Sequence, residues 1–582
     1  MVATIVNDFR LGVDRRRKRI SGPPGSLWTL INAHLTRGGD IEKRKKMVAK
    51  YTVPGTTFGF RKTSTSGYVF GSDAAGTISV PSGVTYQRLV SPSPSSPSMT
   101  ALNDVTLFDG KIYAVATFDD GNTHHFYDGA YVTAWDDGVV RSYTTSLNEI
   151  ATRIAALIND NEDEVATATV SGSTITITGK TNNVSFAVTA DAINGGTTDD
   201  QIAEVTETQA ATASLPEITT VVLGGVLDIG DRFSVTIGDN NYGAGDNPSR
   251  VGTRLFTHGS KMYAMVGPTV YFCAVDDPTE WRANVNGAGF ENLSNSEEGS
   301  LSILGAARYQ GDVAFFAADT TQIWTLDPDP TNNALSRVLE NSGSVSARSM
   351  VPFGNSDILY LSRSGLRSVR SRDVSGAPFV SDIGNAIDSL LIDDMRALGA
   401  TDTALAQGML EPVDGRYMLA LGDKIYVLSY FPGSKITGWS WYEIDEVADF
   451  SADWTSVQGG KLYVRSGNTV YLYGGDDGDT YDTDENDNYV VTVGLPFMGG
   501  KRMFESKTLN QWDMAVTNEW LVDALVDPRN EARKVTLGTV DEITYPDLEY
   551  PSQIDGEMFA LEMTCSSPGA ASVSNFTMHF ED

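Results

Sequence analysis

Apolar and polar residues alternate along the chain in short paired runs, and a tight Gly- or Asp-containing turn joins the two runs of each pair. Five such pairs stand out: GSKMYAMVGPTVYFCAV (259–275), GDVAFFAADTTQIWTL (311–326), SDILYLSRSGLRSVRS (356–371), DGRYMLALGDKIYVLSY (414–430) and GGKLYVRSGNTVYLYGG (459–475). Period-two alternation bounded by turn residues predicts β-strands, and the short turns predict hairpins. We therefore expect five β-hairpins in this half of the chain.

The hairpins recur at a nearly regular interval. Their first residues lie 52, 45, 58 and 45 positions apart. A period near fifty residues, with room for four short strands, is typical of one β-propeller blade of the kelch-like kind. Two earlier runs, 107–129 and 56–73, follow the same plan. The pattern predicts a mainly β protein with a propeller of six to seven blades; a β-sandwich with unrelated hairpins is the alternative.

The pattern changes between the hairpin at 107–129 and residue 255. Ser146 and Glu149 have the spacing of a capping box, and the residues that follow place apolar side chains on one helical face, namely Leu147, Ile150, Ile154, Leu157 and Ile158. An alternating hairpin (164–180) and further strands come next. A helix followed by strands does not fit a propeller blade, so we expect an inserted α+β domain.

These patterns divide the chain into five parts. We expect a basic N-terminal assembly segment, the first propeller blades, the inserted α+β domain, the remaining blades and a C-terminal β-domain, at residues 1–55, 56–134, 135–250, 251–480 and 481–582. A chain of 582 residues with 41% apolar residues can bury several cores. No stretch of 18 apolar residues and no signal-peptide core occurs. We therefore expect a soluble protein, made in a cytosol, without stable membrane insertion.

Charge is distributed very unevenly. Residues 1–62 carry 14 Lys and Arg against 4 Asp and Glu, a net charge of +10, whereas the other 520 residues carry 29 against 71, a net charge of −42. The acidic body is expected to repel nucleic acid. The basic runs could form a solvated arm, a nucleic-acid-binding tail or localisation signal, or a docking segment for an acidic protein surface. We favour docking, with contacts from Arg15, Arg16, Arg17, Lys18, Arg19, Trp28, Lys43, Arg44, Lys45 and Lys46.

Motifs for catalysis, cofactors or metals are nearly absent. The sequence has no GxSxG elbow, no GxxxxGK[ST] phosphate loop, no HExxH and no CxxC, and its two cysteines are far apart. The adjacent His124 and His125 would alternate faces of a strand, and the acidic run 476–487 lacks the spacing of an EF-hand loop. We predict no enzyme, no cofactor and no metal site, with calcium at 476–487 left open.

Two regions carry a resemblance to a known family. They are the N-terminal run SLWTLINAHLTRGGDIEKRKKM, with Asn32-Ala33, Gly38-Gly39 and Glu42-Lys43-Arg44, and the C-terminal run VVTVGLPFMGGKRMFESKTLNQWDMAV (490–516). Both resemble the tail tubular protein B family, the tail nozzles of short-tailed, podovirus-type bacteriophages. Together with the propeller and a platform-like insert, this resemblance covers most of the chain.

The resemblance implies a structural virion protein, made in the host bacterial cytoplasm and located in the viral tail. It implies a homohexameric channel below the tail adaptor protein, through which the genome passes without tight DNA binding, and a shoulder that helps seat a tail fibre or spike protein. The alternative is a β-propeller tail protein that binds or degrades host glycan. A degrading enzyme would need acids or an arginine cluster at the propeller centre, and the run 365–373 offers Arg367, Arg370 and Arg372 for that role.

Overall fold

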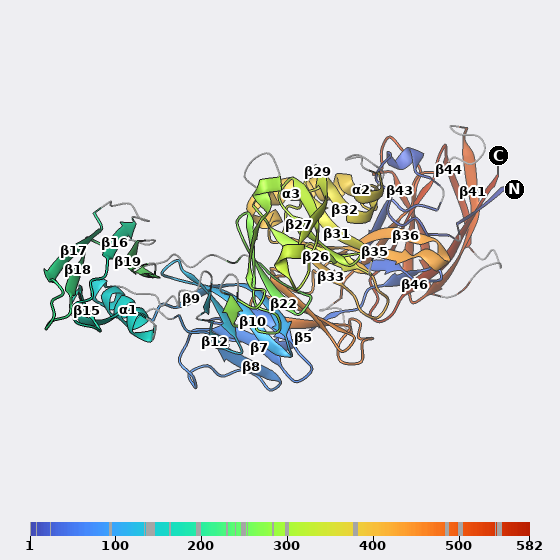
Figure 1. The fold of residues 1–582 in the computed structure, drawn as a ribbon. Coiled ribbons are helices and arrows are strands. Elements are labelled where there is room, and N and C mark those ends of the chain that lie inside the picture. Colours follow the sequence, from blue (N-terminus) through green and yellow to red (C-terminus); the bar gives the residue numbers. More distant parts are fainter. Residues whose placement is uncertain are drawn as a thin grey trace.

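The structure is a computed structural model of the 582-residue chain. It describes all residues except 1, 7, 24, 92–95, 133, 136–145, 162–163, 194–199, 228–230, 239, 246–251, 253, 282–284, 297–301, 355, 376–381, 484–487, 499–504, 542, 544–549 and 582. The described chain is mainly β and is divided into many small sheets. In Figure 1 it has three parts: a small unit containing α1, a central body, and a β-domain that carries both chain ends.

The central body is a β-propeller, which confirms the expected fold class. Seven sheets of the described residues follow one another around it. The first three are β6 (Phe58–Lys62), β7 (Gly67–Gly71) and β8 (Val84–Arg88); β9 (Met99–Phe108), β10 (Lys111–Phe118), β11 (Thr123–Tyr127) and β12 (Ala130–Tyr131); and β21 (Arg254–His258), β22 (Lys261–Val266), β23 (Thr269–Phe272) and β25 (Gly289–Asn292). The next two are β26 (Gly305–Tyr309), β27 (Asp312–Phe316), β28 (Thr320–Thr325) and β29 (Ala334–Glu340); and β30 (Val351–Phe353), β31 (Asp357–Ser362) and β32 (Gly365–Ser368).

The last two blades lead into the C-terminal domain and back to the start of the ring. They are β33 (Gln407–Leu410), β34 (Tyr417–Leu421), β35 (Lys424–Phe431) and β36 (Ile436–Glu443); and β37 (Trp454–Gln458), β38 (Lys461–Ser466), β39 (Thr469–Tyr473) and β5 (Met47–Thr52). The first strands of successive blades contact one another all the way round, from β6 through β37 and back to β6. Between blades five and six lie α2 (Val369–Ser375) and α3 (Asp388–Thr403).

The ring is closed by a strand from the N-terminal region. Strand β5 pairs antiparallel with β39, with Ala49 opposite Tyr471 and Val48 opposite Leu472. Apolar side chains fill the space between neighbouring blades; Phe60 and Val69 of the first blade, for example, pack with Tyr463 and Val470 of the last. The hydrophobic cores therefore lie between blades, as expected when flat sheets stack around an axis.

All seven hairpins read from the sequence belong to blades. Six of them form the second and third strands of a blade, and residues 56–73 contain the first two strands of the first blade. The hairpins are local structures, because each combines two alternating strands with a turn of a few residues. In the hairpin β22–β23, for instance, the turn residue Gly267 has a positive φ of 56°.

The unit inserted between the second and third blades has a core of its own. It comprises α1 (Leu147–Asp160), β14 (Ala166–Ser171), β15 (Thr174–Gly179), β16 (Val188–Ile193), β17 (Ile202–Gln209), β18 (Ile218–Gly224), β19 (Arg232–Ile237) and β20 (Asn240–Gly245). The Ser146 hydroxyl accepts a hydrogen bond from the Glu149 amide at 3.2 Å, so the expected N-cap is present. Ile150 and Ile154 of α1 pack on Ile175 and Phe233 of the sheets. Figure 1 shows this unit projecting away from the propeller, on the side opposite the chain ends.

The C-terminal domain consists of two groups of strands that share one core. One contains β1 (Val2–Val6), β3 (Ala33–Leu35), β4 (Ile41–Lys43), β41 (Lys507–Thr517), β44 (Tyr550–Gly556) and β46 (Ser572–Glu581). The other extends the sixth blade outward from β36 through β2 (Thr29–Ile31), β40 (Val491–Gly494), β45 (Ala560–Cys565), β42 (Trp520–Leu525) and β43 (Lys534–Val540). A short parallel pair, β13 (Ala134–Trp135) and β24 (Glu280–Trp281), lies beside the third blade.

The expectation of a separate assembly segment at residues 1–55 is wrong. Strands β1 to β4 belong to the C-terminal domain and β5 belongs to the seventh blade. Strand β2 lies between β36 of the propeller and β40 of the C-terminal domain. The physical reason is the apolar content of this segment: Phe9, Leu27, Leu30 and Leu35 are fully or almost fully buried in the shared core. Their burial offsets the conformational entropy that an exposed arm would retain.

Candidate functional site

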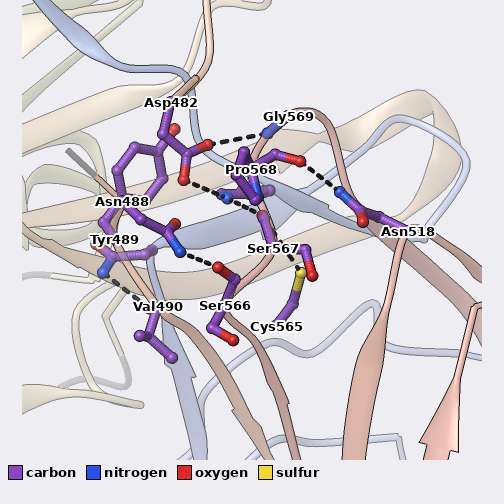
Figure 2. Close-up of polar contacts among 12 residues, drawn as sticks. Asp482, Asn488, Tyr489, Val490, Asn518, Cys565, Ser566, Ser567, Pro568 and Gly569 are labelled. Atoms are coloured by element: carbon purple, nitrogen blue, oxygen red, sulfur yellow. Dashed lines mark hydrogen bonds and ion pairs between the residues drawn. The ribbon is translucent and has the colours of Figure 1, made fainter. Parts of the chain in front are cut away.

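Lys43 ends strand β4 in the interior of the molecule. Its Nζ donates hydrogen bonds to Asp482 Oδ2 at 2.8 Å and to the Ser567 carbonyl at 2.9 Å, and the Lys43 and Asp482 side chains have no exposed surface. Asp482 also accepts a hydrogen bond from the Gly569 amide at 3.2 Å, drawn in Figure 2. The pair therefore ties the N-terminal segment to the chain that leaves the last blade and to the turn before β46.

Arg44 makes a second buried pair one residue later. Its two terminal nitrogens donate to the Glu446 carboxylate at 2.7 and 2.6 Å, and its Nε donates to Asn32 Oδ1 at 2.9 Å. The guanidinium lies 3.7 Å above the centre of the Tyr489 ring. Burial disfavours the charged form, but Glu446 more than offsets it, so the pKa of Arg44 is raised. We call this region, made of Asn32, Lys43, Arg44 and their partners, the charged seam.

Three of the residues expected to contact a partner protein form ion pairs within the chain instead. Lys43 and Arg44 are fully buried, and Arg19, 7% exposed, donates to Glu531 at 2.8 Å and to the Leu495 carbonyl at 3.1 Å. The prediction of partner contacts is therefore wrong for these three. Their acidic partners lie 439, 402 and 512 positions away in the sequence, and a count of charges along the chain does not reveal such pairs.

Three further residues of the basic set, Lys45, Lys46 and Arg15, also interact within the chain. Lys45 lies 3.7 Å from Asp479, and Lys46 also has an interaction partner. The Arg15 guanidinium lies over the Trp28 ring, 3.8 Å from its centre, so Trp28 contacts an arginine of its own chain. Burial, with a smaller contribution from the nearby Arg19, lowers the pKa of Arg15 to about 10.

Arg16, Arg17 and Lys18 are the exposed members of the 15–19 run. Arg16 pairs with Asp14 at 2.5 Å while remaining 48% exposed, so the pair is accessible to water. We call these three residues the basic corner. It is the part of the sequence-derived basic set that the structure leaves open to a partner.

His34 extends the charged seam toward the sixth blade. Its Nδ1 lies 2.8 Å from the Tyr442 hydroxyl, and its Nε2 lies 3.6 Å from Glu42. Burial, reinforced by Arg416 and opposed by Glu42, lowers the pKa of His34 to about 4. The imidazole is therefore neutral near pH 7 and serves as a hydrogen-bonding link between β3 and β36.

A pocket of about 300 Å³ lies where the first strands of the blades meet, at the propeller axis. Its lining comes from several blades and includes Phe60, Arg61, Asp104, Val105, Arg254, Ala347, Arg348, Met350, Gln407, Trp454 and Thr455. We call it the axial pocket. Its three arginines were missed from the sequence; the available signal was an arginine on, or just before, the first strand of three different blades.

The arginines suggested from the run 365–373 do not converge at the axis. Arg367 pairs with Asp388 at 2.9 Å, and Arg372 lies 3.4 Å from Asp382. Arg370 lies at the start of α2 and is exposed. None of the three lines the axial pocket as described. The expected hairpin strand is present at Arg367 in β32, but the chain turns into α2 directly after it, so Arg370 and Arg372 lie on a helix instead of a strand.

The histidine pair and the acidic run have structural environments. His124 and His125 are buried in β11, where burial lowers their pKa values to about 4 and about 3. Within the described part of the chain, no three His, Cys, Asp or Glu residues are grouped as a metal site. In the acidic run 476–487, Asp476 pairs with Lys50 and Asp479 with Lys45; residues 484–487 lie outside the described residues.

Both cysteines are free thiols and buried, Cys273 directly after β23 and Cys565 at the end of β45. Burial raises the pKa of Cys273 to about 12. Within the described chain, no helix has the length and apolar character needed to cross a membrane.

Comparison with known proteins gives distant likenesses of fold only. No protein-family model matches the chain, and no curated protein sequence matches it. The structure is similar to BamB from Moraxella catarrhalis, with 8% identity, a TM-score of 0.32, and coverage of 73% of this chain and 96% of that one. It is also similar to a putative 6-phosphogluconolactonase from Bacteroides uniformis, with 10% identity, a TM-score of 0.26, and coverage of 71% and 91%. The assignment to the β-propeller class therefore rests on the closed ring of blades in the structure itself.

Proposed function

We propose that this chain is a structural virion protein, the tail nozzle of a short-tailed bacteriophage, similar to the tail tubular protein B family. The observation that carries the proposal is the position of the residues that bear the resemblance. Asn32, Lys43 and Arg44 lie together in the charged seam, where the propeller and the C-terminal domain join. Buried ion pairs at this joint would hold the propeller and the C-terminal domain in one relative position, as a structural protein of a viral tail requires.

The proposed assembly is a homohexamer that binds the tail adaptor protein above and helps seat a tail fibre or spike. The genome would pass through its channel without tight binding, and this fits a body whose net charge outside residues 1–62 is −42. In this proposal the basic corner, Arg16 to Lys18, contacts an acidic surface of the adaptor or of a neighbouring copy. Exposed ion pairs contribute only about 0–1 kcal/mol each, so such a contact acts mainly by steering association.

The second candidate is a tail protein that binds or degrades host glycan. It is favoured by one observation, the axial pocket, which offers arginines beside Trp454 at the centre of the propeller. The two candidates differ in where the chain occurs and how many copies assemble.

Cryo-electron microscopy of particles from the phage that encodes this chain tests the proposal. Six copies around the tail axis, directly below the adaptor, are expected. Absence of the chain from purified particles, or its presence only as a peripheral fibre component, would overturn the proposal. Quantitative mass spectrometry of the same particles gives an independent copy number.

A further inference from the structure

The axial pocket gathers positive charge from three blades. Arg61 comes from β6, Arg254 begins β21, and Arg348 lies just before β30. Among the described residues, none of the three has a carboxylate oxygen within 4.0 Å, although the Asp104 carboxylate attracts all three over a longer distance and Asp453 also attracts Arg348. The one acidic residue of the described lining is Asp104, whose two oxygens accept hydrogen bonds from the Leu255 amide at 2.9 Å and the Val105 amide at 2.8 Å. The pocket therefore carries an excess of positive charge.

The guanidinium groups of Arg254 and Arg348 are oriented by neutral groups, and Asp104 compensates the three positive charges only in part. Arg254 donates to the Asn103 carbonyl at 2.6 Å, and Arg348 donates to the Asp453 carbonyl while lying 4.1 Å above the Trp454 ring. Backbone carbonyls and an aromatic face orient a guanidinium but supply no full negative charge. The Nε atoms of Arg61 and Arg254 are buried and have no hydrogen-bond acceptor among the described residues.

This arrangement is unfavourable when the pocket is empty. Burial together with the nearby Arg254 lowers the pKa of Arg348 to about 10, and burial also lowers the pKa values of Arg61 and Arg254. Three buried cations that share one carboxylate of the described lining are incompletely compensated, and charge-assisted hydrogen bonds to an oxyanion would offset the remaining cost in free energy. Arginine is especially suited to carboxylate and phosphate groups because its planar fork matches their geometry.

We propose that the axial pocket binds a small organic oxyanion, a carboxylate or phosphate on a molecule of about monosaccharide size, through Arg61, Arg254 and Arg348. The volume of about 300 Å³ is at the lower end for small-molecule sites. Phe60 and Trp454 offer apolar surface to the rest of the ligand, and Thr455 offers a hydroxyl. This site does not depend on the proposed role in a phage tail.

Isothermal titration calorimetry of the full chain at low ionic strength tests the site. The probes are glucuronate, inorganic phosphate and neutral glucose. We expect one equivalent of glucuronate or phosphate to bind, and glucose not to bind. Tighter binding of glucuronate identifies a carboxylate ligand, and tighter binding of phosphate identifies a phosphate ligand. Binding of neither oxyanion, or equal binding of glucose, would overturn the proposal.

Two variants locate the binding in the axial pocket. Arg61→Gln should weaken binding of the preferred oxyanion about tenfold or more, since a charge-assisted hydrogen bond is lost. Its melting temperature in anion-free buffer should be unchanged or higher, because one of three like charges is removed. Arg396→Gln is the matched control: this arginine is 76% exposed on α3, and its replacement should leave the affinity unchanged.

Asp104→Asn provides a test of opposite sign. Removing the one negative charge of the described lining should strengthen oxyanion binding. The affinity of this variant can be measured even if Arg61→Gln folds poorly. Unaltered affinity in both Arg61→Gln and Asp104→Asn would mean that the anion binds elsewhere, and the proposal would fail.

Discussion

Lys43 and Asp482, 439 positions apart in the sequence, form an ion pair of 2.8 Å with no exposed side-chain surface. The pair crosses from the N-terminal segment to the residues that follow the last propeller blade. Both charges are further satisfied, by the Ser567 carbonyl and by the Gly569 amide. Removal of either partner would leave a buried charge without its counter-charge.

Lys43→Met should therefore lower the free energy of unfolding of the C-terminal domain by about 3–5 kcal/mol. Denaturant unfolding followed through the fluorescence of the buried Trp512 and Trp520 measures this loss. Lys50→Met is the matched control, because Lys50 pairs with the exposed Asp476 at 2.7 Å and should lose only about 0–1 kcal/mol. The double variant Lys43→Met, Asp482→Leu should recover most of the loss. Equal, small losses in both single variants would contradict a structural role for the buried pair.

Gly12→Ala should destabilise the joint between the N-terminal segment and the sixth blade. Gly12 has a φ of 56°, and an added Cβ would lie 2.4 Å from the Trp439 amide nitrogen. We expect a loss of at least about 2 kcal/mol in unfolding free energy, from overpacking and left-handed backbone together. In Gly433→Ala the new methyl group meets no atom within 4 Å, so a change within about 0.5 kcal/mol is expected. Equal changes in the unfolding free energy of the two variants would show that the backbone at Gly12 and Trp439 can move apart at little cost.

His34 should make stability fall between pH 6.5 and pH 4. The folded-state pKa of about 4 lies below the ordinary value of 6.5, so in this window the unfolded chain binds a proton that the folded chain does not. Stability is then lost as the pH decreases, by about 1.4 kcal/mol per pH unit in the middle of the window. His34→Gln should show a flatter profile than the unaltered chain in denaturant unfolding. Taking the difference between the two profiles cancels the contributions of other groups, and a difference that stays constant with pH would contradict the assignment.

Replacing residues 146–245 with a short Gly/Ser linker should leave the propeller folded. The inserted unit has its own core, built around Ile154, Ile177 and Val235. We expect circular dichroism of the shortened chain to retain the β signal and its thermal transition to stay close to that of the full chain. A cooperative loss of all β structure would show that the insert is required for the propeller to fold.

Neutralising the basic corner should slow assembly without unfolding the body. The triple variant Arg16→Gln, Arg17→Gln, Lys18→Gln removes the charges that the structure leaves exposed in this run, and under the proposed nozzle function we expect slower ring or tail assembly with a weaker dependence on salt. Light scattering in the presence of the adaptor protein measures this rate. The control is a triple Arg→Gln variant at three exposed positions of the body, Arg363, Arg396 and Arg529. A normal assembly rate combined with reduced DNA affinity would identify the corner as a nucleic-acid arm instead.

The sequence alone determined the fold class and the position of the insert. Each blade hairpin combines alternation and a turn within about twenty residues, and the helix at 147–160 has its cap and its apolar face in one short run. The backbone hydrogen bonds of a hairpin or a helix join residues that are close in the sequence, so a local pattern is sufficient to predict them. The hairpins at 259–275 and 459–475 could therefore be placed without knowledge of any distant partner, and the chain follows them in β22–β23 and β38–β39.

Tertiary structure alone decided the closure of the ring, the charged seam and the axial pocket. Strand β5 pairs with β39, Arg44 pairs with Glu446, and Arg61 lines one pocket with Arg254 and Arg348, and each of these residues lies far from its partners in the sequence. The basic N-terminal run appeared as a surface for a partner because a linear count of charge cannot show which cations are buried. Burial and pairing depend on which distant segments pack together, and in this chain the propeller and the C-terminal domain enclose Lys43 and Arg44 while leaving the basic corner exposed.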